Sequence, residues 1–143
     1  SNESEWQTFK NNKTNEAFID RVYTVKVPYC LRIKEEVHIY EKLLLNSSLA
    51  KAACAPDTLK MLAQFTVLSR IKEPENSSIY SKMRIYDGEN LKDTDPKAKS
   101  MQEYHDSAGV NEGMNGLSTR FAFKILSKYL TSIPAKYPPI RFT

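Results

Sequence analysis

Apolar positions recur along most of this chain with the period of an α-helix. From residue 33 they are spaced by four, three and four, with charged residues between them, at Ile33, Val37, Tyr40 and Leu44. A second stripe opens after Pro56-Asp57, at Leu59, Leu62, Phe65 and Leu68, and Glu73-Pro74 closes it. Shorter helices are expected over residues 77–86 and 100–108. The pattern predicts a mainly α protein, a helical bundle.

The last expected helix starts within the string E-G-M-N-G-L-S-T-R-F-A-F-K-I-L, residues 112–126, and runs to about residue 132. Two glycines permit a sharp entry turn, and Asn115 or Ser118 can accept hydrogen bonds from the free amides of the first turn. Arg120 falls on a narrow polar strip. The opposite side is expected to be filled by Phe121, Ala122, Ile125, Leu126, Tyr129 and Leu130. Arg120 is therefore either a cation held in place for a function or part of an ordinary solvated face.

Residues 22–29, V-Y-T-V-K-V-P-Y, break the helical pattern. They are β-branched and aromatic, with apolar side chains at both parities, which predicts a strand buried on two faces and ended by Pro28. No other segment reads as a good strand, so either the sheet comes from sequence outside this chain or the strand docks on helices. The polar opening and the lack of a start methionine suggest a piece of a longer protein.

Turn signals separate the helices. Asp87-Gly88 is expected to be a turn, and residues 89–99 an exposed, mobile, charged loop. Beyond residue 133, three prolines forbid a helix, and the tail is expected to be extended or disordered; they are Pro134, Pro138 and Pro139.

Composition narrows the class of protein. The 143 residues suit one domain, and the net charge of +4 is scattered, which is weak evidence for nucleic-acid binding. Cys30 and Cys54 form no C-x-x-C pair and are expected to be buried, and no apolar run is long enough to span a membrane. We expect a cytoplasmic protein with no membrane partner.

Several kinds of catalytic site are excluded because the chain lacks their sequence motifs. The chain contains neither a phosphate-binding G-x-x-x-x-G-K-[ST] loop nor a G-x-G-x-x-G pattern, and it lacks the H-R-D and D-F-G strings of protein kinases. His38 and His105 are not spaced for a zinc site and are expected at the helix surface. No metal site is predicted.

Four stretches together resemble the PrkA-type bacterial serine protein kinases, and the resemblance covers nearly all of residues 1–128. They are S-N-E-S-E-W, N-E-A-F-I-D-R-V-Y-T-V-K-V-P-Y-C-L-R, the run from R-I-K-E-P to D-T-D-P-K, and N-E-G-M-N-G-L-S-T-R-F-A-F-K-I-L. The resemblance implies the second half of an AAA+-type ATPase region, with the phosphate-binding loop upstream and the kinase-like region downstream. It divides the chain into a remnant of the α/β core with one strand (1–32), a helical lid (33–133) and a proline-rich tail or linker (134–143).

The resemblance also implies roles for three residues. Asn2 is similar to the sensor-1 residue that positions the attacking water, and Arg21 to the arginine finger that reaches a neighbouring subunit's nucleotide. Arg120, in G-L-S-T-R, is similar to the sensor-2 arginine that touches the γ-phosphate in its own subunit. Without the resemblance, Arg21 would be expected simply to pair with Asp20 or Glu16.

The resemblance further implies that the parent protein is an ATP-dependent serine protein kinase using ATP and Mg, a homo-oligomer that acts on a protein substrate. The fragment alone is expected to bind no cofactor and to be inactive. A different class of function remains open: a non-catalytic helical interaction module that docks a partner or the kinase-like region.

Overall fold

The computed structural model describes residues 3–52 and 54–132 and confirms a mainly helical protein. Its elements are, in order, α1 (Glu3–Asn11), the 3-10 helix η1 (Lys13–Asn15), α2 (Glu16–Ile19), α3 (Ile33–Leu45), α4 (Thr58–Leu68), α5 (Ile79–Tyr86), α6 (Met101–Ala108) and α7 (Thr119–Ser132). Five of these helices were anticipated by the helical period. Helix α1 was not; it carries acids in its first turn and a lysine in its last, which suits the helix dipole.

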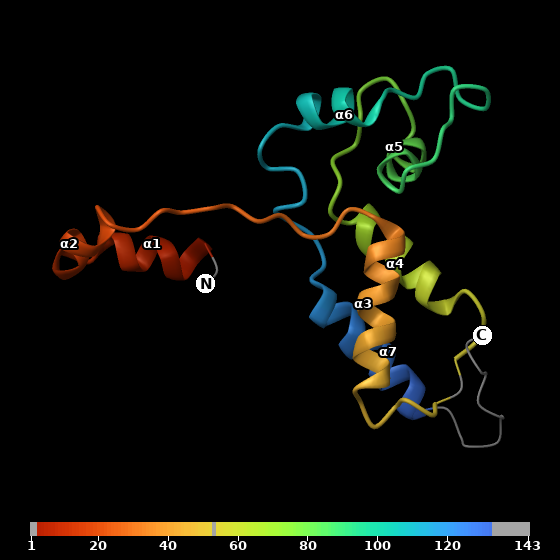
Figure 1. Cartoon of the computed structure of the whole chain (residues 1–143), viewed down its shortest axis with the longest axis horizontal. Coiled ribbons are helices and arrows are strands. Elements are labelled where there is room, and N and C mark those ends of the chain that lie inside the picture. Colours follow the sequence, from red (N-terminus) through yellow and green to blue (C-terminus); the bar gives the residue numbers. More distant parts are fainter. Residues whose placement is uncertain (1–2, 53, 133–143) are drawn as a thin grey trace.

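Helices α3 to α7 with their connecting loops form what we call the helical body. Helix α3 packs on α4 and α7, α4 also contacts α5 and α7, and α5 contacts α6. Figure 1 shows α3 and α7 lying side by side, with α5 and α6 grouped at one end. The core is the inner stripe of each helix, and its most buried members are Tyr40, Ala63, Val67, Tyr104 and Ala122.

The strand expected at residues 22–29 is not formed. Residues 22–32 are extended but pair with no other strand in the described part of the chain, because nothing there offers a free sheet edge. We call residues 20–30 the arm. It leads away from the helical body, and α1 and α2 lie at its far end (Figure 1). Most of its apolar side chains are exposed, Val25 to 65% and Tyr23 to 91%.

The predictions for the loop after α5 and for the cysteines and histidines were confirmed only in part. Asp87 and Gly88 do form a turn, and residues 89–99 contain no helix or strand, although Leu91 in that loop is buried. Cys54 is buried as expected, but Cys30 is only partly buried. His38 and His105 are both exposed, as expected. The tail at residues 134–143 lies outside the described residues.

Candidate functional site

The start of α7 presents an exposed arginine on a firmly held turn. Gly113 and Gly116 take the positive φ angles, 73° and 110°, that the entry turn requires, and Ser118 Oγ accepts a hydrogen bond from the Phe121 amide at 3.2 Å. The side chain of Arg120, in the first turn, is exposed and makes no hydrogen bond or ion pair with any described residue. A free guanidinium at the positive end of a helix favours an anion.

Half of the apolar face of α7 is uncovered. Ala122, Leu126 and Leu130 are buried in the helical body as expected. The neighbouring stripe was also expected to be covered, but it is at least half exposed: Phe121, Ile125 and Tyr129. Helix α7 therefore packs on α3 and α4 mainly through this one stripe of side chains. Its first turn must be fixed by other contacts.

Those contacts converge on Arg70, which follows the end of α4 and is 3% exposed. Its guanidinium forms a bidentate pair with Glu36 of α3, both N–O distances being 2.9 Å. The same group donates to the Cys30 carbonyl at 2.7 Å, the Leu117 carbonyl at 2.8 Å and Thr119 Oγ1 at 3.2 Å. We call this set of contacts the Arg70 junction. It joins α3, α4, the end of the arm and the start of α7.

The electrostatics of the Arg70 junction are balanced. Burial on its own would raise the pKa of Glu36, but the hydrogen bonds and positive charge of Arg70 more than compensate, so the pKa lies below its ordinary value. Glu36 is therefore ionised at neutral pH and is fully paired. In contrast to Arg120, the Arg70 guanidinium has no free face for a ligand.

Backbone contacts tighten the same region. The Tyr29 amide donates to the Gly113 carbonyl at 2.8 Å, and the Leu117 amide donates to Ser69 Oγ at 3.0 Å. A Cβ added to Gly116 would lie 2.4 Å from the Ser69 carbonyl oxygen, so only glycine fits this approach. The turn before α7 is therefore held against both the arm and the end of α4.

Arg21, the second of the sequence-predicted arginines, is not brought to this site. The side chain of Arg21 is exposed at the start of the arm and makes no hydrogen bond or ion pair with any described residue, so neither the pair with Asp20 nor the pair with Glu16 forms. Asn2 lies outside the described residues. Of the three residues, the structure places only Arg120 on the helical body.

A second buried ion pair lies between α5 and the turn before α7. Lys82 Nζ is 2.6 Å from Glu112 Oε1 and donates to the Lys72 carbonyl at 2.9 Å. Tyr86 donates to the same carboxylate at 3.4 Å, and burial together with the Glu112 charge raises the pKa of the Tyr86 hydroxyl well above its ordinary value. The tyrosine therefore stays protonated as a donor, and the pair reads as structural.

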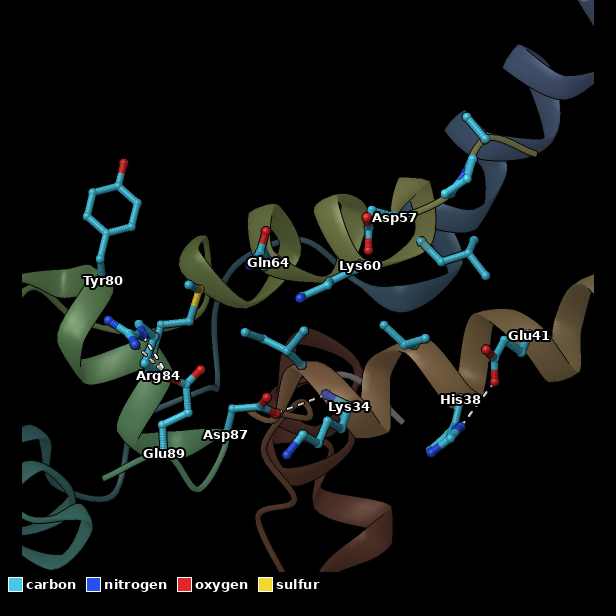
Figure 2. Close-up of a pocket in the computed structure, with 16 residues that line it drawn as sticks. Lys34, His38, Glu41, Asp57, Lys60, Gln64, Tyr80, Arg84, Asp87 and Glu89 are labelled. Carbon is cyan, nitrogen blue, oxygen red and sulfur yellow. Dashed lines mark hydrogen bonds and ion pairs between the residues drawn. The ribbon is translucent and has the colours of Figure 1, made fainter. Parts of the chain in front are cut away.

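An open cleft runs between α3, α4 and α5 (Figure 2). Its charged side chains are largely paired with each other or with the backbone. Asp87 accepts from the Lys34 amide at the start of α3 at 2.9 Å, and Arg84 pairs with Glu89 at 2.8 Å. No convergent set of free polar groups remains in it, and we assign it no function.

The described residues provide neither a metal-binding cluster nor a membrane-spanning helix. Across 3–52 and 54–132, no group of His, Cys, Asp or Glu is arranged to hold a metal ion. Within that part of the chain, every helix is too short or too polar to cross a bilayer.

Arg70, Glu36 and Lys82 were missed by sequence reasoning, although a signal was present. Glu36 lies three residues after Ile33 and four before Tyr40, so it falls on the apolar stripe of α3. Lys82 likewise lies between Ile79 and Tyr86 on one face of α5. A charge inside an apolar stripe predicts a buried partner of opposite charge.

Comparison with known proteins supplies the family context. The family model described as the PrkA AAA domain matches residues 1–78, and the model described as the PrkA serine protein kinase C-terminal domain matches residues 80–139. The chain is 77% identical over 128 residues to "Serine/threonine kinase YeaG" of Escherichia coli K12, and 40% identical over 134 residues to "ATP-dependent protease PrkA" of Bacillus subtilis 168. These alignments cover 90% and 89% of the chain. No solved structure matches.

Two facts in these comparisons bear on the organisation of the chain. It spans about a fifth of the length of the curated relatives it matches. The two family models meet between residues 78 and 80, at the first residue of α5, so sequence matching the C-terminal domain begins inside this chain rather than wholly downstream of it. The subdivision into core remnant, lid and tail stays a prediction.

Proposed function

Because this chain belongs to the PrkA family, we propose that the start of α7 acts on a nucleotide bound by the longer protein, with Arg120 as its sensor-2 arginine. The supporting observation is the contrast between the two arginines of this region. The Arg70 guanidinium is fully hydrogen-bonded to groups within the protein, whereas the exposed Arg120 side chain has no partner among the described residues.

The chemistry of the first turn fits a phosphate group. A guanidinium offers planar paired donors that match phosphate oxygens, and the amides at a helix start add partial positive charge. Held in place before the reaction, such a group stabilises charge that develops on the phosphoryl oxygens. ATP supplies the phosphoryl group when bound, and Arg120 supplies the positive charge near it.

The other inherited roles are proposed with it. Arg21, exposed on the arm, suits an arginine finger that reaches the nucleotide of a neighbouring subunit in a homo-oligomer. Asn2 would be the sensor-1 residue. The described residues offer no cluster of acids for Mg, so its ligands would come from elsewhere in the longer protein. That protein would be a cytoplasmic serine protein kinase with a protein substrate.

Arg120→Ala in the full-length protein tests the central assignment. We expect ATP turnover to fall on the order of 10²-fold, because one preorganised charge on the transferring group is lost. ATP turnover is the readout because it is common to a kinase and to an ATP-dependent protease.

Lys124→Ala is the matched control, since Lys124 is exposed one turn further along the same polar strip. It should leave turnover unchanged. Equal turnover in wild type and Arg120→Ala would remove the sensor-2 assignment. Equal losses in both variants would show a general effect of positive charge instead.

A further inference from the structure

We propose that Arg70 is a positioning residue that mechanically couples the C-terminal end of the arm, at Tyr29 and Cys30, to the start of α7, and so to the setting of Arg120. The functional meaning of this coupling rests on the function proposed above. The coupling itself rests on the contacts of one side chain. It adds a regulatory link between the arm and Arg120, which otherwise lie on separate elements.

Every N–H of the Arg70 guanidinium is committed. The group has five N–H donors in a fixed planar fork. Two are given to the Glu36 carboxylate and one each to the Cys30 carbonyl, the Leu117 carbonyl and Thr119 Oγ1. No donor is left to follow a moving acceptor. Any shift of one acceptor therefore breaks a buried hydrogen bond or rotates the fork.

The pair with Glu36 makes rotation of the Arg70 guanidinium energetically costly. Its two oxygens bind the two terminal nitrogens of Arg70 side by side, with both side chains at 0% exposure, which fixes the plane of the fork relative to α3. With that plane fixed, the remaining donors point along set directions toward the arm and toward α7. Glu36 thus serves as the anchor, and the other three acceptors are the parts that can move.

On the arm side, Arg70 makes two contacts with neighbouring residues. Its Nη1 donates to the Cys30 carbonyl, and its Cζ lies 5.0 Å from the centre of the Tyr29 ring. On the α7 side it binds the carbonyl of Leu117, two residues before the helix begins, and the side chain of Thr119, the first residue within it. Arg120 is the next residue, so the Arg70 hydrogen bonds to Leu117 and Thr119 restrain the backbone just before it.

The consequence is a two-way link. A movement of the arm that displaces Cys30 shifts the Arg70 guanidinium, and with it the hydrogen bonds to Leu117 and Thr119. In the reverse direction, a ligand that displaces Arg120 also displaces Leu117 and Thr119, and so strains the hydrogen bonds of Arg70, including the one to Cys30. The arm and the start of α7 should therefore loosen or tighten together.

Thr119→Val in the full-length protein is the sharpest test, because valine keeps the branched shape and removes only the hydroxyl, which accepts from Arg70 and also interacts with the Glu36 carboxylate. Thr119 itself makes no hydrogen bond to the arm. We expect hydrogen–deuterium exchange to quicken at residues 117–121 and also at residues 29–32, at least about threefold at both. Thr131→Val, the same change at the far end of α7, should alter neither segment.

Faster exchange confined to residues 117–121 would overturn the coupling, and so would no change in either segment. Arg70→Lys provides a second variant, since lysine keeps the charge but has too few donors in the wrong geometry. It should produce the same paired change with larger amplitude. Arg84→Lys, at an exposed ion pair, is its control.

Turnover separates this proposal from the function beneath it. Arg70→Lys should lower the kcat for ATP by about tenfold to a hundredfold, as expected for a misplaced charge. In an Arg120→Ala background it should lower kcat no further. Additive losses would make Arg70 merely structural. If Arg120→Ala leaves turnover unchanged while the paired exchange response persists, the proposed function fails and the coupling stands.

Discussion

The arm and the helical body are built from similarly apolar sequence, yet they bury it to opposite extents. In the helical body Val67 is 0% exposed, whereas Val25 in the arm is 65% exposed. A helix satisfies its own backbone hydrogen bonds and needs only a face to pack, while an extended segment needs a neighbouring strand for both purposes. The helical body is thus packed by contacts among the described residues, whereas most of the arm is not.

The same difference separates the two proposed phosphate-binding arginines. Arg120 lies on a helix whose start is fixed by groups within this chain. Arg21 lies at the start of the arm, which contacts the helical body only near its other end, at Tyr29 and Cys30, among the described residues. The comparison can be tested by changes that should disturb only one of the two regions.

The largest effect is expected from Lys82→Met. Removal of the ammonium leaves the Glu112 carboxylate buried without its ion-pair partner, which should cost about 3–5 kcal/mol in the free energy of unfolding. Urea unfolding of the 143-residue chain, followed by far-ultraviolet circular dichroism, measures it. Addition of Glu112→Leu should restore much of the loss.

Arg84→Met breaks the exposed pair with Glu89 and should cost no more than about 1 kcal/mol. If the buried and exposed pairs gave the same small loss, the helical body would not be the tightly packed unit that the structure shows.

A smaller effect is expected when Gly116→Ala is compared with Gly109→Ala. Both positions have positive φ, but a new Cβ at 116 meets the Ser69 backbone, while at 109 nothing lies within 4 Å. The strain common to both changes cancels in the difference. The clash should therefore appear as an extra loss of about 1–3 kcal/mol at 116, measured by the same urea unfolding. Equal losses would mean that the turn before α7 has room to adjust.

The sharpest comparison is Val67→Thr against Val25→Thr, one chemical change placed in each region. Burial of a hydroxyl at 67 should destabilise the chain by about 1–3 kcal/mol, whereas the change at 25 should stay within about 0.5 kcal/mol. Thermal and urea unfolding of both variants provide the measurement. A loss at 25 as large as that at 67 would show that the arm is packed in the isolated chain.

The helices could be predicted from sequence because their apolar period is local information. The period identified α3, α4 and α7, and Ser118 was correctly among the candidate caps of α7. The strand failed for a complementary reason, since β-propensity at residues 22–29 describes what the segment can do when a partner is present. Pattern alone contains no information about that partner.

The candidate site was predictable only in part. Arg120 was identified from its place in G-L-S-T-R, and its exposure in the structure agrees with the polar strip. The Arg70 junction was not foreseen, because its five hydrogen bonds join segments that approach each other only in the folded state. The charge of Glu36 within an apolar stripe was the one local sign of it.

The long-range character of the Arg70 junction has a consequence for the order of folding. Its partners lie 34 to 49 residues from Arg70 along the chain. Closing such loops costs chain entropy before any contact is gained, so helices should form and pair first and the arginine should be locked in late. Contacts that form after the rate-limiting barrier mainly govern how fast a protein opens. Arg70 should therefore act as a latch on unfolding, with little influence on how quickly the chain folds.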